Sequence, residues 1–225
     1  MVLCLRFKKM AAAWMGTMRG SRFWGITEDG ILTSCAQNMP AGNWGAWSDW
    51  PEPPKDKTTA PPTPVRWIEV TACEQGDGKG ALWALDTKRQ LWGMGQESPG
   101  GNWGGWSGLN WLDAPKLRNI AAVTTAVKKG NETIHGACIW GITDDYKIIY
   151  NEQSVPGGSW FGWSVGSFKD TMRGDEITAA RQNNQSARVW VVSNDDVLVS
   201  QQVNINSSPP GFERFWTPDV EESDK

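Results

Sequence analysis

The residues of this chain that could bind a small molecule occur in a repeated pattern of glutamine and tryptophan. Three copies contain Gln, then Pro, then two tryptophans three positions apart, followed by Ser. An indole ring offers a flat apolar surface, and a carboxamide offers two hydrogen-bond donors and one acceptor. Together they could bind a molecule with one apolar face and a rim of hydroxyl groups. The candidate ligand-binding residues are Gln37, Gln96, Gln153, Trp44, Trp103, Trp160, Trp47, Trp106 and Trp163.

The same pattern also has a structural interpretation. Tryptophan could pack neighbouring units together, glutamine could close a turn, and glycine and proline could shape a hairpin. For these nine residues both roles stay open. The tryptophan that begins each copy lies in the middle of an alternating apolar run, which favours the core. These anchor residues are Trp24, Trp83, Trp140 and Trp190.

A second candidate set differs from one copy to the next. After a short run of small residues, the equivalent positions hold Trp14, Glu74, Thr124 and Arg181. If they surround one opening, Trp14 could stack on a ligand, Glu74 could act as a base or acceptor, and Arg181 could bind an anion or a carbonyl. His135, the only histidine, lies in what we interpret as a variable loop and could overhang the same opening. A solvated loop histidine is the simpler interpretation.

Composition excludes several other functions. The 225 residues include 22 Lys and Arg against 25 Asp and Glu, for a net charge of −3 with no basic block, so we expect no nucleic-acid partner. The sequence has no P-loop, dinucleotide-binding, G-x-S-x-G or H-E-x-x-H motif. The four cysteines are scattered, which favours buried thiols. We therefore expect no metal site and no cofactor.

The sequence also indicates where the chain resides. No apolar run approaches the roughly 18 residues of a transmembrane helix, so we expect no membrane span. The first ten residues lack the apolar core of a signal peptide. We therefore expect a cytoplasmic protein.

Four copies of one unit must position the candidate residues. The anchor tryptophans are 59, 57 and 50 residues apart, and the copies cover residues 5–50, 66–111, 116–168 and 172–216. Each copy reads as four short strands: a small-residue strand, a strand around the anchor, a strand ending near Gln, and a last strand with W-x-x-W-S. No segment has a sustained helical period, so we predict an all-β fold.

Four-stranded units repeated around an axis protect their sheet edges as the blades of a β-propeller. We predict one domain over residues 1–225, with four blades closed into a ring. Residues 51–65 hold six of the 13 prolines and form an inter-blade loop, and 217–225 form an acidic tail. The alternative is part of a larger propeller completed by oligomerisation, so a homo-oligomer is possible.

The motif Q-x-x-P-x-G-x-W-x-x-W-S resembles the repeat of propeller lectins with tectonin-like or fucose-lectin-like blades, over about residues 5–216. The resemblance implies monosaccharide binding between blades, with a tryptophan face against the sugar and polar, Arg or Glu side chains on its hydroxyls. The fourth copy keeps Gln202 and Phe215–Trp216 but loses the Pro-Gly turn. No Arg or Glu recurs at one position in the first three copies, so the sequence does not identify the sugar.

We therefore expect a glycan-binding lectin. The alternative is a biosynthetic enzyme, a metal-independent cyclase or pericyclase, which would bind a hydrophobic small molecule in an aromatic pocket on the propeller axis. Such an enzyme would use Glu74, Arg181, Trp14 and His135.

Overall fold

The computed structural model describes residues 6–15, 20–50, 54–56, 63–109, 114–129, 132–166, 173–183, 186–204 and 211–214. All regular secondary structure in these ranges is β-strand, which confirms the predicted all-β class. The strands form four antiparallel four-stranded sheets and one small two-stranded sheet. The described part of the chain contains no helix that could cross a membrane.

Each four-stranded sheet is one blade and is built from consecutive strands. Blade 1 contains β1 (Phe7–Trp14), β2 (Ser21–Thr27), β3 (Leu32–Ala36) and β4 (Ser48–Asp49), and blade 2 contains β7 (Trp67–Glu74), β8 (Gly80–Asp86), β9 (Leu91–Gly95) and β10 (Ser107–Gly108). Blade 3 contains β11 (Leu117–Lys129), β12 (Glu132–Thr143), β13 (Ile148–Glu152) and β14 (Ser164–Val165). Blade 4 contains β15 (Gly174–Asn183), β16 (Ser186–Ser193), β17 (Leu198–Asn204) and β18 (Gly211–Arg214). The small sheet, β5 (Lys55–Asp56) with β6 (Thr63–Pro64), lies in the proline-rich segment, and the predicted acidic tail and Phe215–Trp216 lie outside the described residues.

The hairpin between the second and third strands of every blade has the same geometry. Its fourth residue adopts a positive φ and donates its backbone N–H to the carbonyl oxygen three residues earlier, as a type I turn followed by a left-handed residue does. Gly30 holds this position in blade 1, where glycine adopts φ 74° without strain. The other blades hold Arg89, Tyr146 and Asp196 there.

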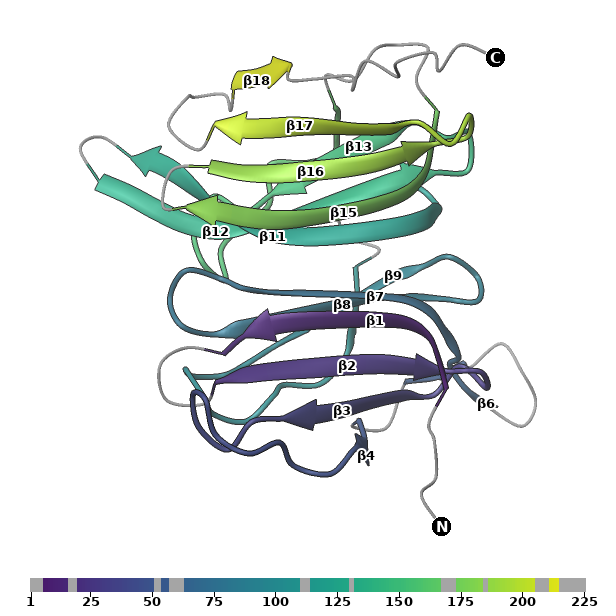
Figure 1. Ribbon diagram of the computed structural model, residues 1–225, viewed down its shortest axis with the longest axis vertical. Helices are drawn as coiled ribbons and strands as arrows, with labels where there is room; N and C mark the ends of the chain where they lie inside the picture. The colour runs from purple at the N-terminus through teal and green to yellow at the C-terminus, as the bar shows by residue number, and fades with distance from the viewer. Residues whose placement is uncertain are drawn as a thin grey trace, which may run out of the picture.

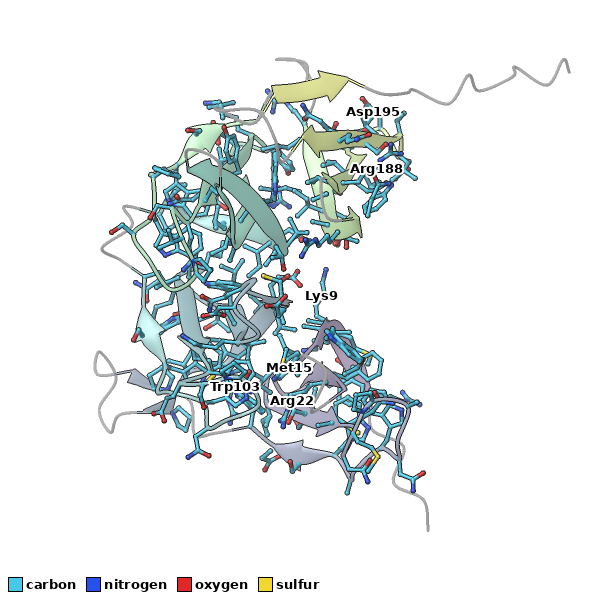
Figure 2. All side chains as sticks on the ribbon, turned by 90° about the vertical axis from the view of Figure 1, so that its left-hand side faces the viewer. Lys9, Met15, Arg22, Trp103, Arg188 and Asp195 are labelled. Carbon is cyan, nitrogen blue, oxygen red and sulfur yellow. The ribbon has the colours of Figure 1, made fainter. Side chains whose placement is uncertain are left out.

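The four blades surround an axis (Figure 2), and their first strands β1, β7, β11 and β15 are innermost. Small residues line the axis because space is tight there. Two cavities along it share a ring of alanines, with one from each blade: Ala12, Ala72, Ala122 and Ala179. The predicted propeller of four repeats is confirmed. In Figure 1 blades 1 and 2 occupy the lower half, and blades 3 and 4 the upper half.

Apolar packing joins the blades in sequence. One buried cluster joins blades 1 and 2, a second joins blades 2 and 3, and a third joins blades 3 and 4. Trp24, Trp83 and Trp140 are buried in these clusters, as expected for the anchors, whereas the fourth anchor, Trp190, is only half-buried. Among the described residues no such cluster joins blade 4 to blade 1.

Blade 4 meets blade 1 through polar side chains at the axis. The Lys9 ammonium lies 2.9 Å from a carboxylate oxygen of Glu176 on β15 and 3.1 Å from one of Glu69 on β7. Asn119 on β11 donates a hydrogen bond of 2.6 Å to Glu176. Each innermost strand therefore contributes one residue to this polar ring, and Lys9 points from blade 1 toward blade 4 (Figure 2).

Burial raises the pKa of the Glu69 carboxyl to about 7, although the Lys9 ammonium opposes the shift. The ordinary value is 4.5, so folding takes up a proton between these two pH values. The free energy of unfolding must therefore fall as pH rises from about 4.5 to about 7 and change little above that range on account of this group.

We expect Glu69→Gln to remove this pH dependence. One pKa unit corresponds to about 1.36 kcal/mol. Between pH 4.5 and 7 the free energy of unfolding should therefore fall by about 3 kcal/mol more for the wild-type protein than for the variant. Urea unfolding of both proteins across this range measures the difference. Glu97→Gln, at an exposed position, is the control. If the free energy of unfolding changed with pH equally in wild type and Glu69→Gln, the pH dependence would not come from Glu69.

Candidate functional site

The repeated glutamines hold the turn that carries the tryptophan pair. The side-chain oxygens of Gln37, Gln96 and Gln153 accept hydrogen bonds of 3.0, 2.8 and 3.1 Å from the backbone N–H groups of Ser21, Gly80 and Ala137. The amides of Gln37 and Gln96 also donate to the carbonyls of Gly42 and Gly101, both at 3.3 Å. These bonds tie the second strand of a blade to its last turn and give the glutamines a structural role.

In blades 2 and 3 the first tryptophan of the pair lies against the preceding blade. Trp103 of blade 2 meets the anchor Trp24 of blade 1 edge to face, with ring centroids 5.7 Å apart. Trp160 of blade 3 meets Trp83 of blade 2 in the same way at 6.2 Å. Trp44 of blade 1 packs on Phe23 of its own sheet, with ring centroids 4.8 Å apart. Its side chain is 43% exposed.

The second tryptophan of each pair covers the start of the innermost strand of its own blade. Trp47 packs on Phe7 with centroids 4.6 Å apart, and Trp106 packs on Trp67 at 4.5 Å. Trp163 packs against the core cluster of blades 2 and 3. All three remain half-buried, so each keeps part of its indole accessible.

A cation lies over one tryptophan, Trp50, at the junction of blades 1 and 2. The Arg22 guanidinium lies over the Trp50 ring, 5.0 Å from its centroid, and donates a hydrogen bond of 3.0 Å to the Ser34 hydroxyl. Trp103 meets Trp50 edge to face at 5.2 Å. Figure 2 shows Arg22, Met15 and Trp103 close together at this junction.

Arg22 was not among the residues selected from the sequence. It lies two positions before its anchor, where the other copies hold Ala81, Cys138 and Arg188. The cation therefore recurs in blades 1 and 4, and a search for residues common to the first three copies misses it. Comparing the first copy with the degenerate fourth would have found it.

The residues that vary between copies do share one opening. Trp14, Glu74, Thr124 and Arg181 line one axial cavity of about 340 Å³ together with alanines of all four blades. The Glu74 carboxylate accepts a hydrogen bond of 2.6 Å from the backbone N–H of Gly78. The Thr124 hydroxyl donates to the Glu74 carbonyl, which links blades 2 and 3 at this level.

The interpretation of His135 as a loop residue was wrong. It lies in β12, paired in register with Ala126 of β11, because these two strands extend as a long hairpin beyond the positions where the other blades turn. Its side chain lies outside the part of the structure that is described.

The cysteines of the described residues are buried free thiols, as the sequence indicated, and they are Cys35, Cys73 and Cys138. Burial raises the pKa of the Cys73 thiol to about 12, which keeps it protonated and unreactive near neutral pH. Within the described ranges no three His, Cys, Asp or Glu side chains gather as a metal site. Cys4 lies outside these ranges.

Comparison with known proteins finds similarity of structure. No family model matches the sequence, and no curated protein matches it either. A triple-arginine mutant of AofleA from Arthrobotrys oligospora has a TM-score of 0.61 at 16% identity over 95% of this chain and 58% of that one. The fucose-specific lectin of Aleuria aurantia has a TM-score of 0.61 at 12% identity, over 95% of this chain and 65% of that one. The BP39L lectin of Burkholderia pseudomallei has a TM-score of 0.60 at 15% identity, over 91% of this chain and 54% of that one.

These similarities extend over most of this chain but only part of the lectins, since the chain spans less than two thirds of their length. The Aleuria aurantia lectin is described as a six-bladed β-propeller, so four blades correspond to part of such a ring. The resemblance seen in the repeat motif is confirmed at the level of the fold, and this chain has the β-propeller fold of these lectins.

Proposed function

We propose that this protein is a lectin that binds monosaccharide units of glycans at the junctions between its blades. The solved structures that share its fold include lectins described as fucose-specific or in complex with a methyl fucoside. The observation that carries the proposal is the group formed by Arg22, Trp50 and Trp103 at the junction of blades 1 and 2.

The chemistry of this group suits a sugar. A guanidinium has five N–H donors in a planar fork, a geometry that suits hydroxyl oxygens, and Arg22 donates one hydrogen bond to Ser34. Trp50 is buried beneath Arg22, so the half-buried Trp103 would provide the apolar face for the C–H side of a sugar ring. Arginine stays charged at all physiological pH values, so binding at this group should not depend on pH through Arg22 itself.

The repeated tryptophans offer a second location for the same function. Trp47, Trp106 and Trp163 stay half-buried on three similar blades, so each could hold one sugar and the three together would raise avidity on branched glycans. The inter-blade group at Arg22 is favoured because it adds a charged donor to the aromatic surface.

We expect Arg22→Gln to weaken glycan binding by about 10- to 100-fold, the usual effect of losing a hydrogen bond to a charged group. A glycan array with wild-type protein identifies the ligand, and isothermal titration measures its affinity for each variant. Arg66→Gln, at an exposed arginine, is the matched control. If Arg22→Gln binds as wild type while the triple alanine variant of Trp47, Trp106 and Trp163 does not, the sugar site lies at those tryptophans.

We expect Gln96→Leu to lower the free energy of unfolding by about 1–3 kcal/mol, because the Gly80 N–H and the Gly101 carbonyl lose their partner. Glycan affinity of the folded variant should be unchanged. Thermal unfolding and titration report the two effects separately, with Gln90→Leu at an exposed position as control. A loss of affinity without a loss of stability would make Gln96 a ligand-binding residue.

The axial cavity supports a second candidate function, the binding or conversion of a hydrophobic small molecule. The observation that favours it is that four unlike residues, one per blade, line a single cavity large enough for such a ligand. In this candidate Trp14 stacks on the ligand while Glu74 and Arg181 bind its polar groups.

For a small molecule found by screening, Glu74→Gln and Arg181→Met should each abolish binding or turnover. Glycan binding should survive in both variants. Full activity in both would exclude the proposed roles of these two residues.

A further inference from the structure

The Trp50 side chain fills the space between the facing sheets of blades 1 and 2. It lies beneath the Arg22 guanidinium of blade 1, and its Nε1–H donates a hydrogen bond of 2.9 Å to the Met94 sulfur of blade 2. The backbone N–H of Trp50 donates to the carbonyl oxygen of Leu32, the first residue of β3. At this junction a buried apolar side chain therefore separates the residues of the two sheets.

The equivalent position between blades 3 and 4 is a glycine. Leu109 and Gly166 donate their backbone N–H groups to the carbonyl oxygens of Leu91 and Ile148, which begin β9 and β13. They therefore take the place of Trp50 in blades 2 and 3. Leu109 still packs in the core cluster of blades 2 and 3. Gly166 has no side chain, so it fills none of the space between blades 3 and 4.

A buried acid lies on the face of blade 3 that packs on blade 4. Glu152 is paired in register with Cys138, which belongs to the core cluster shared by these blades, so both side chains point toward blade 4. The Glu152 residue is 6% exposed, and its carboxyl accepts a hydrogen bond of 2.6 Å from the Thr125 hydroxyl. Burial raises the pKa of this carboxyl, and the bond from Thr125 opposes the shift. Among the described residues no cation pairs with Glu152.

An unpaired carboxamide lies on the facing side of blade 4. Gln201 is paired in register with Val189, which is fully buried in the same core cluster, so its side chain points toward blade 3. Gln201 is 3% exposed, yet neither its Oε1 nor its Nε2 has a hydrogen-bond partner. It takes the place of Met94, which is paired with Leu82 in the same way. A buried polar side chain without partners is costly, which indicates that a further molecule bonds to it.

We propose that Thr125, Glu152 and Gln201 form a second ligand site, which binds the ammonium group of an amino sugar. We call it the acidic junction site. Cys138 and Gln201 hold the positions of Arg22 and Met94, so this site borders the space that corresponds to that of the Trp50 indole. That the ligand is a sugar rests on the function proposed above.

An ammonium group complements this site. It supplies the positive charge that the Glu152 carboxylate lacks, and its three N–H donors suit the carboxylate and the Gln201 carbonyl oxygen. The Gln201 amide can then donate to a neighbouring hydroxyl oxygen of the sugar. Tyr150, two residues before Glu152 on the same face of β13, is half-buried and adds an aromatic surface for the ring. Because blade 1 presents the cation Arg22 and blade 3 an acid, the two junctions select different sugars.

Isothermal titration with D-glucosamine and D-galactosamine tests the charge of the ligand, with the N-acetyl derivatives as uncharged counterparts. We expect wild-type protein to bind one of the amino sugars more than about tenfold more tightly than its derivative, and Glu152→Gln to lose that preference. Glu97→Gln, at an exposed acid, is the matched control and should bind as wild type. Equal affinity of Glu152→Gln and wild type, or a wild-type protein that binds neither amino sugar, would overturn the proposal.

Gln201→Leu separates a ligand site from a purely structural role. The amino-sugar affinity should fall by more than about fivefold, while the thermal unfolding temperature stays equal or rises, because the variant removes a buried polar group that has no partner. Gln90→Leu, at an exposed position, is the control. A variant that loses stability but keeps its affinity would mean that Gln201 bonds to a trapped water, and would exclude it from the site. Gln201→Leu also replaces Glu152→Gln if that variant fails to fold.

The Arg22→Gln variant distinguishes this proposal from the function proposed above. It should keep the amino-sugar affinity of wild type, because Arg22 lies at another junction. Amino-sugar binding that depends on Glu152, with no glycan bound on the array, would remove the lectin function at Arg22 and keep the acidic junction site. Glycan binding that depends on Arg22, without amino-sugar binding, would do the reverse.

Discussion

The fold depends on the burial of the anchor tryptophans between blades, and in the first two junctions a tryptophan of the next blade packs on the anchor edge to face. Sheets of four short strands, of which the last has only two residues in blades 1 to 3, cannot each bury a core alone. The indole has enough area to fill the wedge between two twisted sheets and enough apolar character to bury it. Each blade is thereby stabilised by its neighbours, as in other repeat architectures.

This constraint also explains where a ligand can bind. A tryptophan that reaches across a junction leaves part of its ring facing the outer edge of that junction. Any polar side chain at the second strand then lies beside an aromatic surface, as Arg22 does. Blade 2 has Ala81 and blade 3 has Cys138 at the equivalent position, and neither of these side chains is a cation. Chemistry therefore differs between junctions while the packing is conserved among the copies.

The side chains along the axis differ in kind from the tryptophans at the junctions. Alanines line the axis where four strands approach closely, and among the described lining residues the charged side chains lie toward its two ends. At one end Lys9 forms ion pairs with Glu69 and Glu176, and Asn119 donates a hydrogen bond to Glu176, so all four blades are linked. The Glu176 side chain is 60% exposed, so its ion pair with Lys9 adds little to stability, but it links two blades at the axis. It does so at the junction of blades 4 and 1, where apolar packing is lacking among the described residues.

The sequence by itself determined the number of blades, the strand class, the buried anchors and the small residues of the axis, because each depends on a local period that recurs along the chain. It also placed Trp14, Glu74, Thr124 and Arg181 at one level, since equivalent repeat positions must occupy equivalent places around an axis. Only the tertiary structure decided which face of each blade is covered. It also decided that the glutamines bond to the backbone, that His135 lies in a strand, and that Arg22 lies over an indole. These features depend on contacts between residues far apart in the chain. A repeat pattern indicates where a residue lies within its own blade, but it does not indicate which residues contact it there.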